Sequence, residues 1–340
     1  MIIAGQKFDI SDTLDSSITV PDCLVKRNNK IGGGNGEAKL YITSKPSMYD
    51  FFGEPGFTVR CFILRQDLED YMNAIHAEYL HPSQSYRGVD EMPKLWVERM
   101  NTINALPEVI EFNVKDQDQI IGPRGYIKSS DFGYDIIREI SLPLVSYISV
   151  MRLVDKSGLP VFYWKLFADF DAISDKRDAL VFTYGKKGEK DAKYIKPKET
   201  SRQKEIRYAR VGQGLYREKL LSECPFCPIT MINDERLLIA SHIKPWAVSS
   251  ETEKLDYKNG FMLSPLYDKL FDRGFMTFTE DRCIVLSNWI SPSNKKRIGI
   301  KEGQFVQMLP LDDFRKEYMK FHRASVFKGY LIFQERTQST

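Results

Sequence analysis

Four polar side chains that are close in the sequence have the types and spacing of a hydrolytic site. His242 ends an apolar stretch, Asn259 follows after a short loop, and Asp268 and Asp272 lie four residues apart. An imidazole has an unperturbed pKa of about 6.5, so its neutral form is present near pH 7 to accept a proton from water. Carboxylates four residues apart project from one face of a helix and suit a hard cation. Together these groups suit metal-assisted cleavage of a phosphodiester bond.

The residues around these side chains predict two strands and a short helix. Residues 236–243 and 261–263 are apolar enough for strands, with a loop between them. A helix over residues 265–273 is indicated by the residue types at its ends, namely a capping hydroxyl, a first-turn proline and a glycine just past the end (Ser264, Pro265 and Gly274). The predicted order is strand, loop, strand, helix.

In this order the segment resembles the ββα-metal (HNH) nuclease motif, in the form found in restriction-type endonucleases. The resemblance covers roughly residues 205–290 and includes residues 212–217 and 224–230 upstream of the motif. It implies that His242 is the general base and that Asn259 supports the loop and positions that base. It also implies metal ligands at the third motif position, Asp268, and four residues further on, at Asp272.

Two positions depart from the family pattern. The third motif residue is usually His or Asn, whereas this chain has Asp268, and the residue before the base is often an Asp ligand, whereas this chain has Ser241. Ser241 can offer only a hydroxyl or a water-mediated contact to the metal. Oxygen ligands with retained waters favour Mg²⁺ or Mn²⁺ over zinc. Lys244 and Arg273 are close enough in the sequence to add positive charge near a DNA phosphate, as is Lys269.

The cysteines do not predict a disulfide framework or a structural zinc site. There are five cysteines, an odd number, and Cys224 and Cys227 have the spacing of half a zinc site. No second pair with that spacing follows. Cys283 and His322 could complete the site only if the tertiary fold happened to bring them next to Cys224 and Cys227. Structural Zn²⁺ is therefore not expected, and we expect Cys224 and Cys227 to pack in the turn before the first strand.

The charge distribution predicts a linker between two domains. The net charge is +3, yet residues 186–210 contain ten Lys and Arg against four acidic residues. We predict a domain at 1–185, a basic linker at 186–210 and an HNH domain at 211–340 with its motif core at 236–274. The linker is either simply solvated or contacts DNA phosphates. The candidate DNA-binding residues in it are Lys193, Lys196, Lys198, Arg202 and Lys204.

The first domain contains no recognisable motif, and its pattern is that of an α+β fold. Helices are predicted over residues 66–80 and 131–140, and paired strands over 146–154 and 161–168. The aromatic residues of the last strand and just after it are expected to be core residues (Phe162, Tyr163, Trp164, Phe167 and Phe170). In the second domain, a hairpin over 275–278 and 283–286 and a closing helix over 311–327 are predicted to cover the motif.

These features predict a type II-like restriction endonuclease that cuts double-stranded DNA and acts as a homodimer, because a palindromic site needs two active sites. One alternative is a phage-defence effector nuclease whose first domain senses a ligand and whose cleavage has little sequence specificity. Another is a catalytically inactive DNA-binding protein, which the missing acid at Ser241 favours. No apolar run of 18 residues and no secretory signal is evident, so we expect a cytoplasmic protein that does not contact a membrane.

Overall fold

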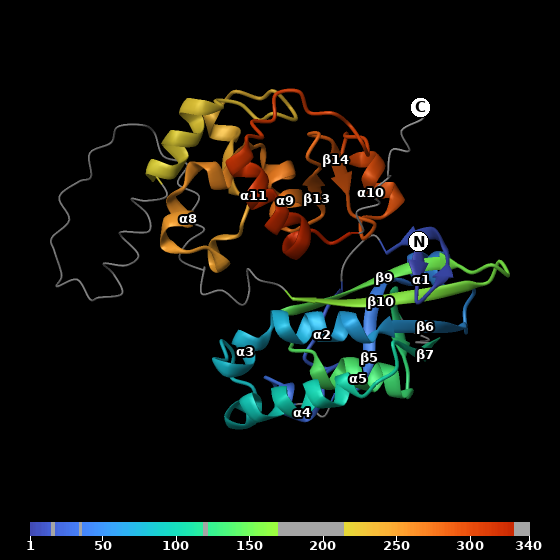
Figure 1. Cartoon of the computed structure of the whole chain (residues 1–340). Coiled ribbons are helices and arrows are strands. Elements are labelled where there is room, and N and C mark those ends of the chain that lie inside the picture. The colour runs from blue at the N-terminus through green and yellow to red at the C-terminus, as the bar shows by residue number, and fades with distance from the viewer. Residues whose placement is uncertain (15–17, 34–35, 118–121, 169–213, 330–340) are drawn as a thin grey trace. The chain divides into compact units, whose positions relative to one another are not determined.

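The computed structural model describes residues 1–14, 18–33, 36–117, 122–168 and 214–329 (Figure 1). The chain divides into two compact units, one containing residues 1–168 and the other residues 214–290 and 294–329. Both units contain helices and strands, so the predicted α+β class is confirmed. The predicted boundary at residue 185 and the basic linker at 186–210 lie outside the described residues. Among the described residues, no helix is both long and apolar enough to cross a bilayer.

The first unit is built on an eight-stranded sheet with the order β3-β9-β10-β6-β7-β8-β5 and with β4 beside β9. Strands β6 and β10 are parallel, and the other neighbouring pairs are antiparallel. A small separate hairpin joins β1 (Ile2–Ile3) and β2 (Gln6–Lys7). The bounds of the sheet strands are β3 Asp9–Thr13, β4 Ile18–Thr19, β5 Lys39–Ser44, β6 Thr58–Leu64, β7 Val109–Asp116, β8 Arg124–Lys128, β9 Ser146–Val154 and β10 Pro160–Ala168.

Helices cover one face of this sheet. Glycines let two of them approach closely, because a Cβ on Gly125 of β8 would lie 2.8 Å from Met48 of α1, and one on Gly133 of α5 would lie 2.8 Å from Phe112 of β7. Helix α2 packs on β6 and β10, and α3 and α4 pack on one another and on α2. The helix bounds are α1 Lys45–Phe52, α2 Arg65–Ala74, α3 His76–Leu80, α4 Met92–Asn104 and α5 Phe132–Ile140.

Most of the predicted elements of the first unit are present. The helix predicted over 66–80 is interrupted at Ile75, which separates α2 from α3, and α5 matches the helix predicted over 131–140. Strands β9 and β10 form the predicted antiparallel pair. Four of the five aromatic residues expected in the core are buried there (Phe162, Tyr163, Trp164 and Phe167). Phe170 lies outside the described residues.

The second unit contains three small elements in the predicted order, β11 (Ile239–His242), β12 (Gly260–Leu263) and α9 (Pro265–Asp272). The first strand starts three residues later than predicted, because the Asp234 side chain caps a 3₁₀ turn at Glu235–Leu237 by accepting a hydrogen bond from the Arg236 N–H. Helical residues 214–223 precede this motif. The elements around it are α8 Glu251–Leu255, β13 Met276–Phe278, β14 Ile284–Leu286, α10 Pro292–Arg297 and α11 Asp313–Phe321.

The predicted hairpin of β13 and β14 is present, and the predicted closing helix is shorter than expected. Helix α11 begins after Asp312, whose side chain caps it, and continues into a single π-helical turn at His322–Val326. His322 in that turn is buried, and its ring stacks on Phe271 of α9 at 3.9 Å between centroids. Phe271 also packs against Phe261 and Phe278. The π-helical turn therefore packs against α9 through His322 and Phe271.

Candidate active site

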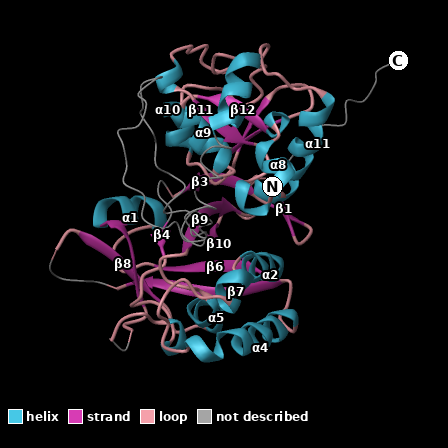
Figure 2. Ribbon diagram, turned by 90° about the vertical axis from the view of Figure 1, so that its left-hand side faces the viewer, coloured by secondary structure: helices cyan, strands magenta, loops and turns pink. Residues whose placement is uncertain are grey.

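The motif side chains are placed on a ββα frame. Strands β11 and β12 pair antiparallel with His242 opposite Gly260, and α9 follows β12 and packs against β11. Figure 2 shows β11, β12 and α9 together in the second unit. His242 is the last residue of β11, Asn259 is the residue before β12, and Asp268 lies in the first turn of α9. The frame therefore brings residues from three segments of the motif into one small substructure.

The His242 ring is held by contacts on several sides. It stacks on the Tyr216 ring, with centroids 4.2 Å apart and an interplanar angle of 7°, and it makes an edge-to-face contact with the Trp246 ring, with centroids 5.4 Å apart. Its Nε2 lies 3.0 Å from the carbonyl oxygen of Lys254. A carbonyl only accepts hydrogen bonds, so Nε2 carries the proton and the lone pair of the neutral imidazole is on Nδ1. The bond thus selects the tautomer in which Nδ1 can accept a proton.

Asn259 closes the loop between the two strands. The side chain is fully buried, and its Oδ1 accepts a hydrogen bond from the Lys244 N–H at 2.8 Å. Its Nδ2 lies 3.2 Å from the Lys244 carbonyl, 3.1 Å from the Glu253 carbonyl and 3.4 Å from Ser249 Oγ. One amide therefore bridges both ends of the loop. Because Glu253 is adjacent to Lys254, this bridge also positions the carbonyl that binds His242.

Tyr216 connects the imidazole to the strand backbone. Its hydroxyl donates to the Asn259 carbonyl at 2.9 Å, while its ring covers His242. Gly260 makes this approach possible. Its backbone is extended, with φ −166°, so any residue could adopt it, but a Cβ there would lie 1.9 Å from the Tyr216 hydroxyl oxygen. Tyr216 falls within the upstream segment of the family resemblance, yet neither contact could be inferred from its place in the sequence.

The candidate metal ligands fit a hard cation by their chemistry. Asp268 is half-buried and Asp272 is exposed, both on α9. Ser241 is 3% exposed, and its Oγ is buried without a hydrogen-bond partner. A buried hydroxyl in that state suits a bound cation or one of its waters, and two carboxylates with retained waters are a usual Mg²⁺ set. In the described part of the chain no three His, Cys, Asp or Glu side chains converge as a metal cluster, so water would supply the remaining ligands.

The structure assigns Lys244 a contact that the sequence did not suggest. Its Nζ lies 2.7 and 2.8 Å from the two carboxylate oxygens of Glu253. The hydrogen bond from Lys244 is the main cause that lowers the pKa of Glu253 to about 2. Glu253 also completes the capping box of α8 with Ser250. Lys244 therefore stabilises the loop, and its contact with DNA stays a prediction, as does that of Arg273 at the end of α9. The candidate DNA-binding residues of the linker lie outside the described residues (Lys193, Lys196, Lys198, Arg202 and Lys204).

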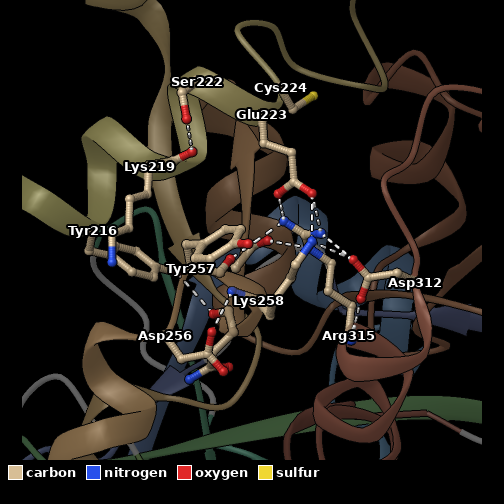
Figure 3. A network of polar contacts seen from close by, with 12 residues as sticks. Tyr216, Lys219, Ser222, Glu223, Cys224, Asp256, Tyr257, Lys258, Asp312 and Arg315 are labelled. Atoms are coloured by element: carbon tan, nitrogen blue, oxygen red, sulfur yellow. Dashed lines mark hydrogen bonds and ion pairs between the residues drawn. The ribbon is translucent and has the colours of Figure 1, made fainter.

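A network of ion pairs around a buried arginine connects β12 to the helix before the motif and to α11 (Figure 3). Arg315 of α11 is 0% exposed and binds Glu223 at 2.5 Å, Asp312 at 2.9 Å and the Gly260 carbonyl at 3.0 Å. Lys258 bridges the same two carboxylates at 2.7 Å each. Hydrogen bonds from Arg315, the largest cause, hold the pKa of Glu223 below its usual range. Because Glu223 ends the helix that carries Tyr216, the network fixes that helix to β12. Sequence inspection missed it entirely.

Cys224 and Cys227 lie in the turn that precedes β11, where both are buried. The Cys227 N–H donates to the Ile232 carbonyl at 2.9 Å and its carbonyl accepts from Met231 at 2.8 Å. Burial raises the pKa of the Cys224 thiol. His322, which the sequence offered as a distant zinc ligand, instead lies 3.0 Å from the Phe271 carbonyl and 3.0 Å from Thr277 Oγ1.

Comparison with known proteins agrees with this geometry. A family model described as HNH endonuclease matches residues 227–279. The matched segment includes β11, β12 and α9, and with them His242, Asn259 and Asp268. No curated protein matches the chain. Together, the ββα frame and this match identify an HNH endonuclease domain within the second unit.

Proposed function

We propose that this chain is a divalent-metal-dependent endonuclease of restriction type that hydrolyses phosphodiester bonds in double-stranded DNA. The observation that carries the proposal is the 3.0 Å contact between His242 Nε2 and the Lys254 carbonyl. It orients a neutral imidazole with Nδ1 as the acceptor, at the end of a strand in an HNH domain. A neutral imidazole held in this orientation is suited to accepting a proton from the attacking water.

His242 acts as the general base in this proposal. Nδ1 takes the proton of the attacking water, and the resulting imidazolium keeps its Nε2–H donation to the Lys254 carbonyl, which strengthens as positive charge develops. The face of the Tyr216 ring, 4.2 Å away, also stabilises the charged imidazolium. Asn259 keeps the loop in place, so the carbonyl needs no reorganisation during the reaction.

Asp268, Asp272 and the Ser241 hydroxyl are the groups that would hold Mg²⁺ or Mn²⁺. When bound, such an ion supplies stabilisation of the negative charge that develops on the phosphate and the leaving oxygen. Arg273 and the basic linker would add positive charge along the DNA backbone. A homodimer would place one such site on each strand of a palindromic sequence, with the first unit responsible for recognition.

The test is digestion of plasmid DNA with Mg²⁺ or Mn²⁺ by the full chain. We expect discrete fragments from the wild type and loss of cleavage in His242→Ala, with DNA binding retained. His81→Ala is the matched control, because His81 is exposed and in the other unit. Cleavage by His242→Ala at the wild-type rate would rule out the base assignment, and a smear would favour an effector nuclease with little sequence specificity. If the wild type binds DNA but does not cut, Ser241 in place of an acid would favour the inactive DNA-binding protein.

A further inference from the structure

The face of the first unit's sheet opposite to the helices is open over β5, β7 and β8. Along β7 the residues alternate, with Ile110, Phe112 and Val114 buried and Glu111, Asn113 and Lys115 exposed. The buried set packs with the helices in the core of this unit. On β8, Gly125 and Ile127 are buried toward α1, while the intervening side chains are exposed or half-buried (Arg124, Tyr126 and Lys128). The exposed and half-buried side chains of β7 and β8 therefore lie on the face of the sheet that points away from the helices, which we call the outer face.

Three lysines lie in a row across this outer face. Lys128 of β8 is directly opposite Lys115 of β7 on one side and Lys39 of β5 on the other. Neighbouring strands are about 4.8 Å apart, and like charges directly opposite one another disfavour folding. Lys39 has an acidic partner in Glu37, next to β5, but the outward positions of β5 and β8 contain no acidic residue. A row of this kind is stabilised when an anion with closely spaced charges lies along it.

Two tyrosines form the next row of the same face. Tyr41 is directly opposite Tyr126, with ring centroids 5.5 Å apart, and Tyr41 is 44% exposed. Cations flank the pair, because Lys39 Nζ lies 5.4 Å from the Tyr126 ring and the Arg124 guanidinium lies 5.9 Å from the Tyr41 ring. Lysine, arginine and tyrosine side chains are the usual donors to DNA phosphates. The face thus presents cations and hydroxyl donors over two rows.

We propose that this outer face, formed by Lys39, Tyr41, Lys115, Arg124, Tyr126 and Lys128, binds the sugar–phosphate backbone of duplex DNA. Charge complementarity is the argument for this partner, because a row of lysines without intervening acids on β5 and β8 matches the regular charges of a DNA strand. The inference rests on the proposed function only in taking DNA as the substrate. It assigns the first unit a DNA-contacting surface, whatever that unit recognises in addition.

The test is DNA binding by the full chain carrying His242→Ala, so that cleavage does not interfere. We compare Lys115→Gln/Lys128→Gln with Lys94→Gln/Lys156→Gln as a matched control, since both pairs remove two positive charges from the same unit. Lys94 is on α4, with its side chain 81% exposed, and Lys156 is in the exposed turn between β9 and β10. Fluorescence anisotropy with a labelled duplex is measured over a series of salt concentrations.

We expect the Lys115/Lys128 variant to reduce the log–log salt slope by about 1.8, since each lost phosphate contact removes about 0.9. If the variant and the parent bind equally at 1 M salt, this change in slope makes the variant bind about 60-fold more weakly than the parent at 0.1 M salt. The DNA affinity of the control variant should stay within about twofold of that of the parent, because its lost charges act on DNA only through the screened overall field. The thermal midpoint of the Lys115/Lys128 variant should be equal to or above that of the parent, because a like-charge contact is removed.

An equal loss of DNA affinity in the Lys115/Lys128 variant and in the Lys94/Lys156 control would overturn the proposal. It would also be overturned if a single strand bound more tightly than the duplex and Tyr41→Leu weakened binding as much as the lysine pair, because the face would then stack bases. The two proposals fail separately. Loss of cleavage in His242→Ala together with unchanged binding by the lysine variant would reject only the DNA surface, whereas unchanged cleavage with weakened binding would reject only the catalytic assignment.

Discussion

Acidification should destabilise the second unit through His322. This ring is fully buried between Phe271 and Thr277, and burial is the main cause that lowers its pKa from 6.5 to about 4. Its contacts suit only the neutral form, with Nε2–H donating to the Phe271 carbonyl and Nδ1 accepting from the Thr277 hydroxyl. In the unfolded chain the imidazole regains its ordinary pKa, so between pH 6.5 and 4 the unfolded state binds more protons than the folded state.

The size of the effect follows from these two pKa values. The contribution of His322 to stability is present above pH 6.5 and is lost as the pH falls toward 4. Between pH 7 and pH 5 the loss is about 2 kcal/mol, because one pKa unit corresponds to about 1.4 kcal/mol. Below pH 4 both states are protonated and this part of the pH dependence ends.

The measurement is urea unfolding of the wild type and of His322→Gln at pH 7, 6 and 5. Pulsed hydrogen exchange of peptides from α9 and α11 reports on the second unit alone. We expect His322→Gln to be less stable at pH 7, because its amide cannot reproduce the ring contacts, but the difference from wild type should narrow by about 2 kcal/mol at pH 5. A difference that is constant over this pH range would refute the reasoning, since it would mean that His322 does not change protonation on unfolding.

Three further predictions concern the support of the site. Asn259→Ala should destabilise the second unit by about 3 kcal/mol, because it leaves several buried loop groups without partners, and hydrogen exchange of the loop before β12 should increase more than elsewhere. Tyr216→Phe should retain most cleavage in single-turnover assays, since it keeps the ring on His242 and loses one hydrogen bond worth about 1 kcal/mol, whereas Tyr216→Leu should cleave far more slowly. Arg315→Met should cost about 3 kcal/mol in urea unfolding, because it removes a fully buried guanidinium and leaves the Gly260 carbonyl and two partly exposed carboxylates short of a donor. Lys320→Met, which breaks an exposed ion pair with Glu317, should cost less than about 0.5 kcal/mol.

Each of these predictions has a contrary result. Uniform exchange across the second unit in Asn259→Ala would argue against a local loop bridge. Equal cleavage rates for the phenylalanine and leucine variants at position 216 would show that stacking on His242 does not matter. Equal losses of stability for Arg315→Met and Lys320→Met would indicate that Arg315 contributes no more than a surface ion pair does.

Local signals in the sequence were sufficient to predict the motif elements. The proline and glycine at the two ends of α9, and the apolar runs of β11 and β12, act over a few residues each and are visible without tertiary information. Gly274 has φ +71°, in the left-handed region that its place after the helix predicted. Ser264 precedes the helix as expected but makes no side-chain capping hydrogen bond.

Features that depend on distant partners could not be predicted. Arg315 and Glu223 are 92 residues apart in the sequence, and nothing local to either indicates the pair. Lys244 binds Glu253 because the loop between them folds back. Its place two residues after His242 suggested only that it lies near the DNA phosphate. Ile75, where α2 ends and α3 begins, is fully buried, and the local sequence does not indicate a break at this residue. The row of lysines across the outer face likewise requires the register of three strands, which alternation along one strand does not determine.

The contact between Tyr216 and Gly260 links two positions that should evolve together. Gly260 needs no special backbone conformation, so close packing is what excludes a side chain: a Cβ there would lie 1.9 Å from the Tyr216 hydroxyl oxygen and 2.9 Å from the Ser241 carbonyl oxygen. Among relatives of this domain we therefore expect covariation. Sequences with tyrosine at the equivalent of 216 should keep glycine after the motif asparagine, and sequences with a smaller residue there should contain alanine or serine at that position more often. In the laboratory the same relationship predicts compensation, with Gly260→Ala tolerated better in a Tyr216→Phe background than in the wild type.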